Sequence, residues 1–90
     1  MFLVVYDIEN DRLRSRFSKF LERYGRRMQY SVFVIKNSPR ILDNVKSEIQ
    51  GRFASCFKQG DSVLIYRVPD DSCVGRFGYP VNEETDLVIK

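Results

Sequence analysis

Residues 1–10 read MFLVVYDIEN, an apolar run that ends in acidic residues. The short length of the run and its β-branched and aromatic residues predict a β-strand. Because successive side chains of a strand point to opposite faces, one face carries Phe2, Val4, Tyr6 and Ile8. The other face carries Leu3, Val5, Asp7 and Glu9. Asp7 therefore ends an otherwise apolar face, where a carboxylate must reach solvent or meet a hydrogen-bond donor, an opposite charge or a cation.

Length and composition indicate one domain over residues 1–90, with a core at 1–68 and a C-terminal loop and strand at 69–90. A domain of this size often gains stability by pairing with a second copy. The sequence has no run long enough to span a membrane and no signal-peptide pattern, so we expect a cytoplasmic protein. Cys56 and Cys73 are expected to be small core residues rather than a disulfide.

Charge is distributed unevenly along the chain. Residues 1–40 hold nine Lys or Arg against four acids, whereas residues 41–90 hold six against eight. Concentrated basic charge is typical of proteins that bind nucleic acid or an acidic protein. The chain has no histidine, which excludes the usual general base, Ser-His or Cys-His nucleophiles and histidine-ligated zinc. Catalysis would have to use carboxylates with a hard metal ion, or Lys, Tyr or Ser in an unusual role.

A helix is predicted after the first strand, with Asn10 or Asp11 as its N-cap and Gly25 as its C-terminal cap. Its apolar positions have the spacing of one helical stripe: Leu13, Phe17, Phe20, Leu21 and Tyr24. A second stripe is basic and is formed by Arg12, Arg16, Lys19 and Arg23, with Arg26 and Arg27 extending it past the cap. This stripe is either a solvated helix face or a surface that binds phosphates.

The remaining elements follow from similar patterns. Residues 28–36, MQYSVFVIK, predict one long bent strand or two short ones. Ser38 and Pro39 open a second helix, whose buried side is expected to carry Ile41, Leu42, Val45 and Ile49. A turn at 59–61 leads into a strand at 62–68, and a loop leads to a last short strand at 86–89.

This order of elements predicts an α+β sandwich, with helices on one face of an antiparallel sheet. The other face of the sheet then needs a cover, and the simplest cover is a second copy packed sheet to sheet. A two-fold axis near Asp7 would bring two carboxylates together, and such a site of hard oxygen ligands suits Mg²⁺ or Mn²⁺, one per dimer.

Several short patterns in residues 1–68 resemble the family of CRISPR-associated protein 2. They are Tyr6-Asp7-Ile8, the basic helix, Tyr24-Gly25 followed by Arg27, Gln29, Ser31 and Phe33, and Asp61-Ser62-Val63. In one departure, Val34 stands where the family often has an acid.

The resemblance implies a ferredoxin-like β-α-β-β-α-β protomer with an extra C-terminal strand, and a homodimer in which that strand joins the partner's sheet. It also implies that the region 28–36 splits into two strands. The family's metal-binding and catalytic aspartate matches Asp7, one from each protomer. Basic residues of the family helix fall among Arg12, Arg14 and Arg16, and the motif residues of the interface or core match Tyr6, Gln29, Ser31 and Phe33.

Three functions remain open from the sequence. The first is a CRISPR adaptation protein with metal-dependent endonuclease activity on single-stranded RNA or double-stranded DNA. The second is a non-catalytic dimeric adaptor that bridges CRISPR integrase subunits and binds DNA through phosphate contacts, made by Arg12, Arg14, Arg16, Lys19, Arg23 and Arg27. The third is a toxin-like endoribonuclease of the same fold. An RNA-recognition module is disfavoured, because the chain lacks the glycine-aromatic RNP signature.

Overall fold

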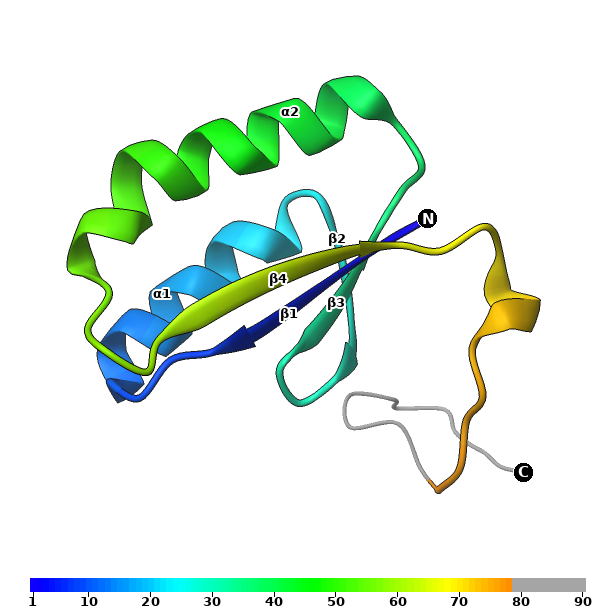
Figure 1. Cartoon of the computed structure of the whole chain (residues 1–90), viewed down its shortest axis with the longest axis horizontal. Coiled ribbons are helices and arrows are strands. Elements are labelled where there is room, and N and C mark those ends of the chain that lie inside the picture. Colours follow the sequence, from blue (N-terminus) through cyan, green and yellow to red (C-terminus); the bar gives the residue numbers. More distant parts are fainter. Residues whose placement is uncertain (79–90) are drawn as a thin grey trace.

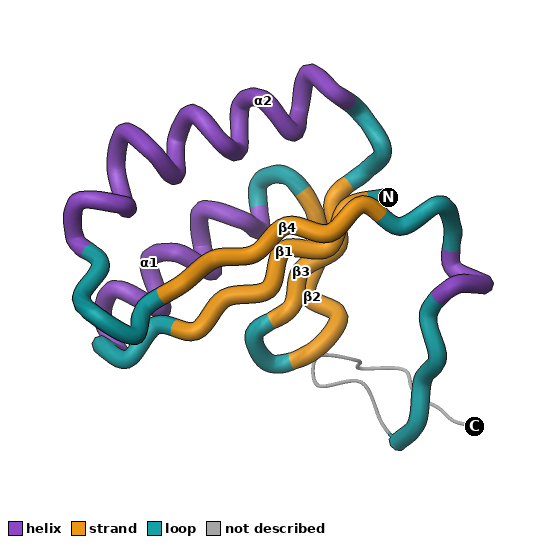
Figure 2. Tube along the Cα trace, in the orientation of Figure 1, coloured by secondary structure: helices purple, strands orange, loops and turns teal. Residues whose placement is uncertain are grey.

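The computed structural model describes residues 1–78, and the predicted strand at 86–89 lies outside them. The element order is β1 (Phe2–Asp7), α1 (Asp11–Glu22), β2 (Gly25–Gln29), β3 (Val32–Ile35), α2 (Pro39–Glu48) and β4 (Ser62–Arg67). The four strands form one antiparallel sheet in the order β2-β3-β1-β4. This is the ferredoxin-like arrangement, and both helices lie on one side of the sheet (Figure 1, Figure 2). The predicted α+β fold is therefore confirmed.

The core lies between the sheet and the two helices, because each element turns its apolar side inward. Phe2, Val4 and Tyr6 of β1 are buried, while Leu3 and Val5 are only half-buried and Asp7 is exposed. Aromatic rings fill the centre, with Phe17 of α1 packed edge-on against both Tyr6 and Phe53 at centroid distances of 5.0 Å. The alternation predicted for β1 is confirmed.

Local signals place the helix ends. The Asn10 side chain caps α1 by accepting a hydrogen bond from the Leu13 N–H at 2.8 Å, and the Ser38 hydroxyl caps α2 by accepting one from the Ile41 N–H at 3.3 Å. Beyond α2 the chain continues as a π-helical turn, Ile49–Phe53, which contains Gly51, and a 3₁₀ turn, Ala54–Cys56. Gly60, at φ 98°, closes the turn before β4.

Two sequence predictions need correction here. Gly25 does not cap α1 with a positive φ; Arg23 is the C-cap, and Gly25 begins β2. A Cβ at Gly25 would lie 1.9 Å from the backbone oxygen of Val34, so glycine allows β2 to approach β3 closely. Cys56 and Cys73 are not core residues, because both are exposed free thiols.

The region 28–36 divides into two strands. The hairpin turn falls at Tyr30 and Ser31, where no Asn-Gly or Asp-Gly pair marks it in the sequence. A register shift between Arg27 and Gln29 adds one residue to β2 opposite β3. The alternative of two short strands, which the family resemblance implied, is the correct one.

A carboxylate links the two helices at the surface. Glu48 of α2 accepts hydrogen bonds from the Tyr24 hydroxyl at 2.8 Å and from Arg52 Nη1 at 2.5 Å, and Arg23 Nη2 lies 3.4 Å away. These partners hold the pKa of Glu48 below its usual value, and the Tyr24 hydrogen bond is the largest cause. The charged form of Glu48 therefore stabilises the fold.

We expect Glu48→Gln to lower the free energy of unfolding by about 1 kcal/mol at pH 7, because a charge-assisted hydrogen bond is lost. A group with a lowered pKa in the folded state contributes stability above its unfolded pKa and loses it as the pH falls through the folded value. The difference between wild type and Glu48→Gln should therefore shrink as the pH falls below the usual glutamate range, and vanish below the lowered pKa of Glu48. Urea unfolding at pH 7 and pH 3, at one protein concentration, measures this difference. Glu22→Gln, at an exposed carboxylate of α1, is the matched control; an equal loss in both variants would contradict the role of the Glu48 network.

No helix within residues 1–78 is long and apolar enough to cross a membrane.

Candidate functional site

Asp7 is the last residue of β1 and its side chain is exposed. It pairs in register with Ser62, the first residue of β4, so both side chains project from the same face of the sheet. Within residues 1–78, the Asp7 carboxylate has no hydrogen bond and no ion pair to another side chain or backbone group. Asn10 caps α1, so Asp7 does not serve as the cap of that helix. Asp7 is thus a free carboxylate at the end of a strand.

The face of the sheet that carries Asp7 is the one without helices, and we call it the open sheet face. Its apolar residues follow from the strand register: Leu3, Val5, Val32, Val34, Leu64 and Tyr66. Leu64 and Tyr66 are 53% and 52% exposed. A contiguous exposed apolar surface of this kind marks an interaction site. The packing of a second copy on this face stays a prediction.

The described residues of one protomer offer few ligands for a metal ion. No cluster of three or more His, Cys, Asp or Glu side chains occurs within residues 1–78. Asp7 offers two hard oxygen atoms, and the hydroxyl of Ser62 lies on the same face of the sheet. These donors suit a cation such as Mg²⁺, which keeps several waters and uses only one or two protein carboxylates. Asp7 therefore fits as half of a site that two protomers would share.

The basic stripe of α1 is present as predicted. Arg12, Arg16, Lys19 and Arg23 are all exposed. In the described part of the chain, only Arg23 among these four has an ion pair, with Glu48 at 3.4 Å. The stripe does not continue into Arg26 and Arg27, because these residues lie in β2 and point to opposite faces of the sheet. The extension of the stripe past α1 is therefore wrong.

Two of the cations predicted to bind nucleic acid are used inside the protomer. Arg14 donates from Nη1 to the carbonyl oxygens of Ile8 at 2.9 Å and Glu9 at 3.3 Å, and from Nη2 to the Asp11 carboxylate. Arg27 donates to the Tyr30 carbonyl oxygen at 2.6 Å and lies over the Phe33 ring, 5.1 Å from its centroid. Both side chains therefore hold loops next to the Asp7 end of the sheet.

The other motif residues divide between core and surface. Tyr6 and Phe33 are buried with their rings 6.3 Å apart, whereas Gln29 precedes the hairpin turn and Ser31 lies in it. Burial raises the pKa of the Tyr6 hydroxyl, and the nearby Arg27 and Arg14 act in the opposite direction. Tyr6 therefore stays protonated at neutral pH and is not a general base there.

A shallow groove of about 560 Å³ runs along the N-terminal end of α1. Among the residues that line it are Arg12 and Arg16 from the basic stripe, and Lys58 and Asp61 from the turn before β4. Lys58 was missed by the sequence analysis, because only the tertiary fold brings residue 58 beside α1. Glu9 and Asp11 also line the groove, so with Asp61 its three acidic residues balance its three basic residues.

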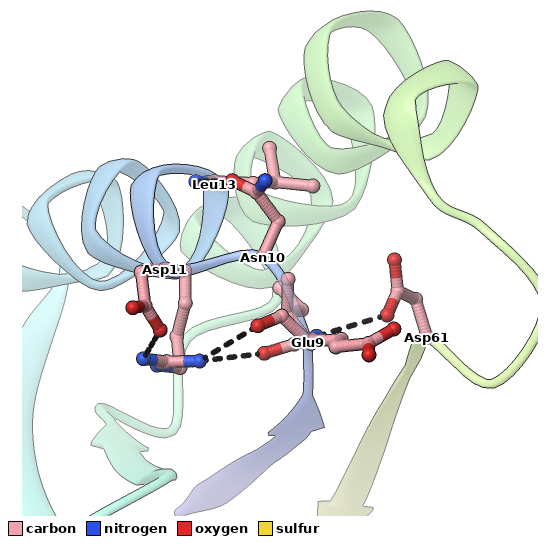
Figure 3. A network of polar contacts seen from close by, with 7 residues as sticks. Glu9, Asn10, Asp11, Leu13 and Asp61 are labelled. Atoms are coloured by element: carbon pink, nitrogen blue, oxygen red, sulfur yellow. Dashed lines mark hydrogen bonds and ion pairs between the residues drawn. The ribbon is translucent and has the colours of Figure 1, made fainter.

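The segment between β1 and α1 is held by hydrogen bonds from three side chains (Figure 3). Asn10 caps the helix, Arg14 donates to the carbonyls of Ile8 and Glu9, and the Asp61 carboxylate accepts from the Glu9 N–H at 3.0 Å. The sequence analysis used Asp61 only as a motif residue. Its contact with Glu9 joins positions 52 residues apart, and no local pattern predicts such a contact.

Most of the chain matches the model of a known family. The model of the family described as CRISPR associated protein Cas2 matches residues 1–74. A curated relative from Thermus thermophilus, named CRISPR-associated endoribonuclease Cas2, is 34% identical over 96% of this chain and 94% of its own length. A relative of similar name from Archaeoglobus fulgidus is 37% identical over 74% of this chain and 67% of its own length.

Solved structures show the same fold. A crystal structure of Cas2 superimposes with a TM-score of 0.72 at 28% identity, and the match covers 98% of this chain and 95% of the other. The crystal structure of Streptococcus pyogenes Cas2 at pH 6.5 gives a TM-score of 0.69 at 23% identity, covering 86% of this chain and 98% of the other. The match to the Streptococcus pyogenes structure supports only the assignment of the fold.

Proposed function

This chain belongs to the CRISPR associated protein Cas2 family, and from this membership we propose that it is an endonuclease that hydrolyses phosphodiester bonds of RNA. We further propose that it acts as a homodimer and requires a divalent metal ion. The substrate class is supported by the names of its curated relatives from Thermus thermophilus and Methanospirillum hungatei, which are CRISPR-associated endoribonucleases. The family match also favours a CRISPR protein over a toxin-like endoribonuclease of the same fold.

One observation carries this proposal: within residues 1–78, Asp7 is an exposed carboxylate without a polar partner, at the edge of an apolar face on which neither helix packs. A strand-end acid with a purely structural role would be expected to cap a backbone amide or to form an ion pair. Asp7 does neither within the described residues. A second copy packed on the open sheet face would bring the Asp7 carboxylates of both protomers close together.

Two such carboxylates favour a bound cation, because like charges at close range are otherwise unfavourable. When bound, a divalent ion polarises a phosphate oxygen and lowers the pKa of a coordinated water. The residues that would hold it are Asp7 of each protomer. The Ser62 hydroxyl shares their face of the sheet and can accept or donate a hydrogen bond beside them.

The proton of the attacking water has no obvious acceptor near neutral pH. The chain has no histidine, and burial keeps Tyr6 protonated. We therefore expect cleavage to be slow at neutral pH and faster at alkaline pH. The proposed function is tested by comparing RNA cleavage by wild type and Asp7→Asn, with and without divalent metal.

A second candidate function is a DNA-binding adaptor that bridges CRISPR integrase subunits, and the basic stripe favours it. The four residues of the basic stripe are exposed, and Lys58 lines the same groove as two of them, Arg12 and Arg16. Contacts of this kind bind phosphates without reading base sequence. A dimer would carry two basic stripes, and these could bind duplex DNA without cleaving it.

We expect Arg16→Ala and Lys58→Ala each to reduce the slope of log K against log salt for duplex DNA by about one unit, because each loses one phosphate contact. Fluorescence anisotropy over a salt range of about 50 to about 200 mM, in which phosphate contacts dominate the change in affinity, measures the slope. Arg40→Ala, at an exposed position of α2 outside the groove, is the matched control and should leave the slope unchanged. An equal change in all three variants would show that net charge, rather than the groove, controls binding.

A further inference from the structure

The direction of the Asp7 side chain depends on the segment that follows β1. Residues 8–10 are neither helix nor strand, so no backbone ladder fixes them. Arg14 holds the carbonyl oxygens of this segment, at Ile8 and Glu9. Ile8 is also buried in the core, and Asn10 caps α1. A further anchor is the hydrogen bond from the Glu9 N–H to Asp61 Oδ1, at 3.0 Å (Figure 3).

Asp61 uses both of its carboxylate oxygens. While Oδ1 accepts from Glu9, Oδ2 accepts from the Lys58 N–H at 2.9 Å, and the Asp61 N–H donates to the Lys58 carbonyl oxygen at 2.9 Å. One side chain therefore closes the turn around Gly60 and ties that turn to the segment after β1. The two backbone hydrogen bonds also hold the pKa of Asp61 below its usual value, so the carboxylate remains an acceptor in acid.

The position of this link in the sheet connects it to Asp7. The last register pair between β1 and β4 is Asp7 with Ser62. Asp61 directly precedes Ser62, and Glu9 lies two residues after Asp7. The hydrogen bond between Glu9 and Asp61 therefore holds β1 and β4 together immediately beyond the Asp7–Ser62 pair. Without it, β1 and β4 could fray from this end, and the Asp7 carboxylate would sample more directions.

We propose that Asp61 is a positioning residue, which orients the Asp7 carboxylate for a divalent cation by fixing the backbone on the C-terminal side of β1. This inference rests on the proposed function of Asp7. Loss of a group that orients a metal ligand without itself binding the metal typically lowers metal affinity or activity by about 10–100-fold. Asp61 itself is not assigned as a ligand, since both of its oxygens already accept backbone hydrogen bonds.

The test is Asp61→Asn, which keeps the shape of the side chain but replaces one acceptor oxygen with a donor that faces a backbone N–H. Glu9→Gln is the matched control, since it removes a neighbouring charge but keeps the Glu9 N–H that Asp61 binds. Mn²⁺ binding to the protein without nucleic acid is measured by electron paramagnetic resonance of the free ion. RNA cleavage is measured in parallel as kcat and KM.

We expect Asp61→Asn to weaken Mn²⁺ binding by about 10-fold and to lower kcat, with little change in KM, because the basic stripe is untouched. Glu9→Gln should bind Mn²⁺ as the wild type does. Far-UV circular dichroism checks the fold; if Asp61→Asn is unfolded, Asp61→Ser, which keeps one acceptor, replaces it. Wild-type Mn²⁺ affinity in a folded Asp61 variant would overturn the inference.

The outcomes separate this inference from the proposed function. If wild type binds Mn²⁺ and cuts RNA while Asp61→Asn matches it in both, the inference fails and the proposed function stands. If wild type binds Mn²⁺ and Asp61→Asn binds it more weakly, the inference is supported even when neither protein cuts RNA. If wild type binds no Mn²⁺, both the metal role of Asp7 and the role of Asp61 are overturned.

Discussion

Asp7→Asn should lower the rate of metal-dependent RNA cleavage at least about 100-fold, because loss of a ligand should cost no less than loss of a group that only orients one. Asn keeps the size of the side chain but removes the negative charge that holds a divalent cation. The exposed Asp7 carboxylate has no hydrogen bond in residues 1–78, so the substitution should not disturb the protomer. Cleavage of labelled single-stranded RNA with Mg²⁺, Mn²⁺ or EDTA, at neutral and alkaline pH, measures the effect.

Asp43→Asn is the matched control, because Asp43 is an exposed carboxylate on α2, away from the open sheet face. It should cut RNA at the wild-type rate when purified in the same way. The proposal for Asp7 is wrong if Asp7→Asn retains wild-type cleavage, or if cleavage persists in EDTA. If none of the proteins cuts RNA while all bind duplex DNA, the adaptor function is favoured.

Leu64→Arg should raise the dissociation constant of the dimer at least about 100-fold. Leu64 is 53% exposed in the protomer and pairs in register with Val5 on the open sheet face. In a dimer packed sheet to sheet, an arginine at this position would be buried without an opposite charge, which costs about 3–5 kcal/mol. Since each ~1.4 kcal/mol corresponds to a factor of ten in an equilibrium constant, this cost corresponds to a rise of at least about 100-fold in the dissociation constant.

Sedimentation velocity over a range of concentrations measures this dissociation, and the RNA cleavage rate should fall with the fraction of dimer. Ser47→Arg adds the same side chain to the exposed side of α2 and should leave both the dimer and cleavage unchanged. Far-UV circular dichroism should be the same for both variants, because each position is exposed in the protomer. A Leu64→Arg variant that remains dimeric would show that the copies pair through another surface.

Local patterns in the sequence predicted most of the described fold. The alternation in residues 1–10 assigned β1 and placed Asp7 on the face opposite Tyr6, because side-chain direction in a strand follows from backbone geometry alone. The helix signals at Asn10 and Ser38 were also correct. Strand alternation and helix caps depend only on residues close together in the chain, so they can be recognised in a single sequence. The role of Asp7 as a metal ligand remains a prediction.

The errors and omissions concern contacts that form only in the folded chain. The exposure of Cys56 could not be deduced locally, since burial depends on what packs against a residue. Arg14 and Arg27 looked like surface cations, but the fold supplies carbonyl oxygens within their reach. Gly25 was assigned as a helix cap, whereas its close approach to Val34 is a property of the β2-β3 pair.

The sequence by itself thus determined most of the strands, the N-terminal ends of the helices, the basic stripe of α1 and the face on which Asp7 lies. Only the tertiary structure brought Lys58 beside Arg16 and placed the Asp61 carboxylate against the Glu9 N–H. The physical reason is the range of the interactions. Periodicity and capping arise from neighbours along the chain, whereas a groove or a bridging carboxylate exists only after the strands have paired and the helices have packed on the sheet.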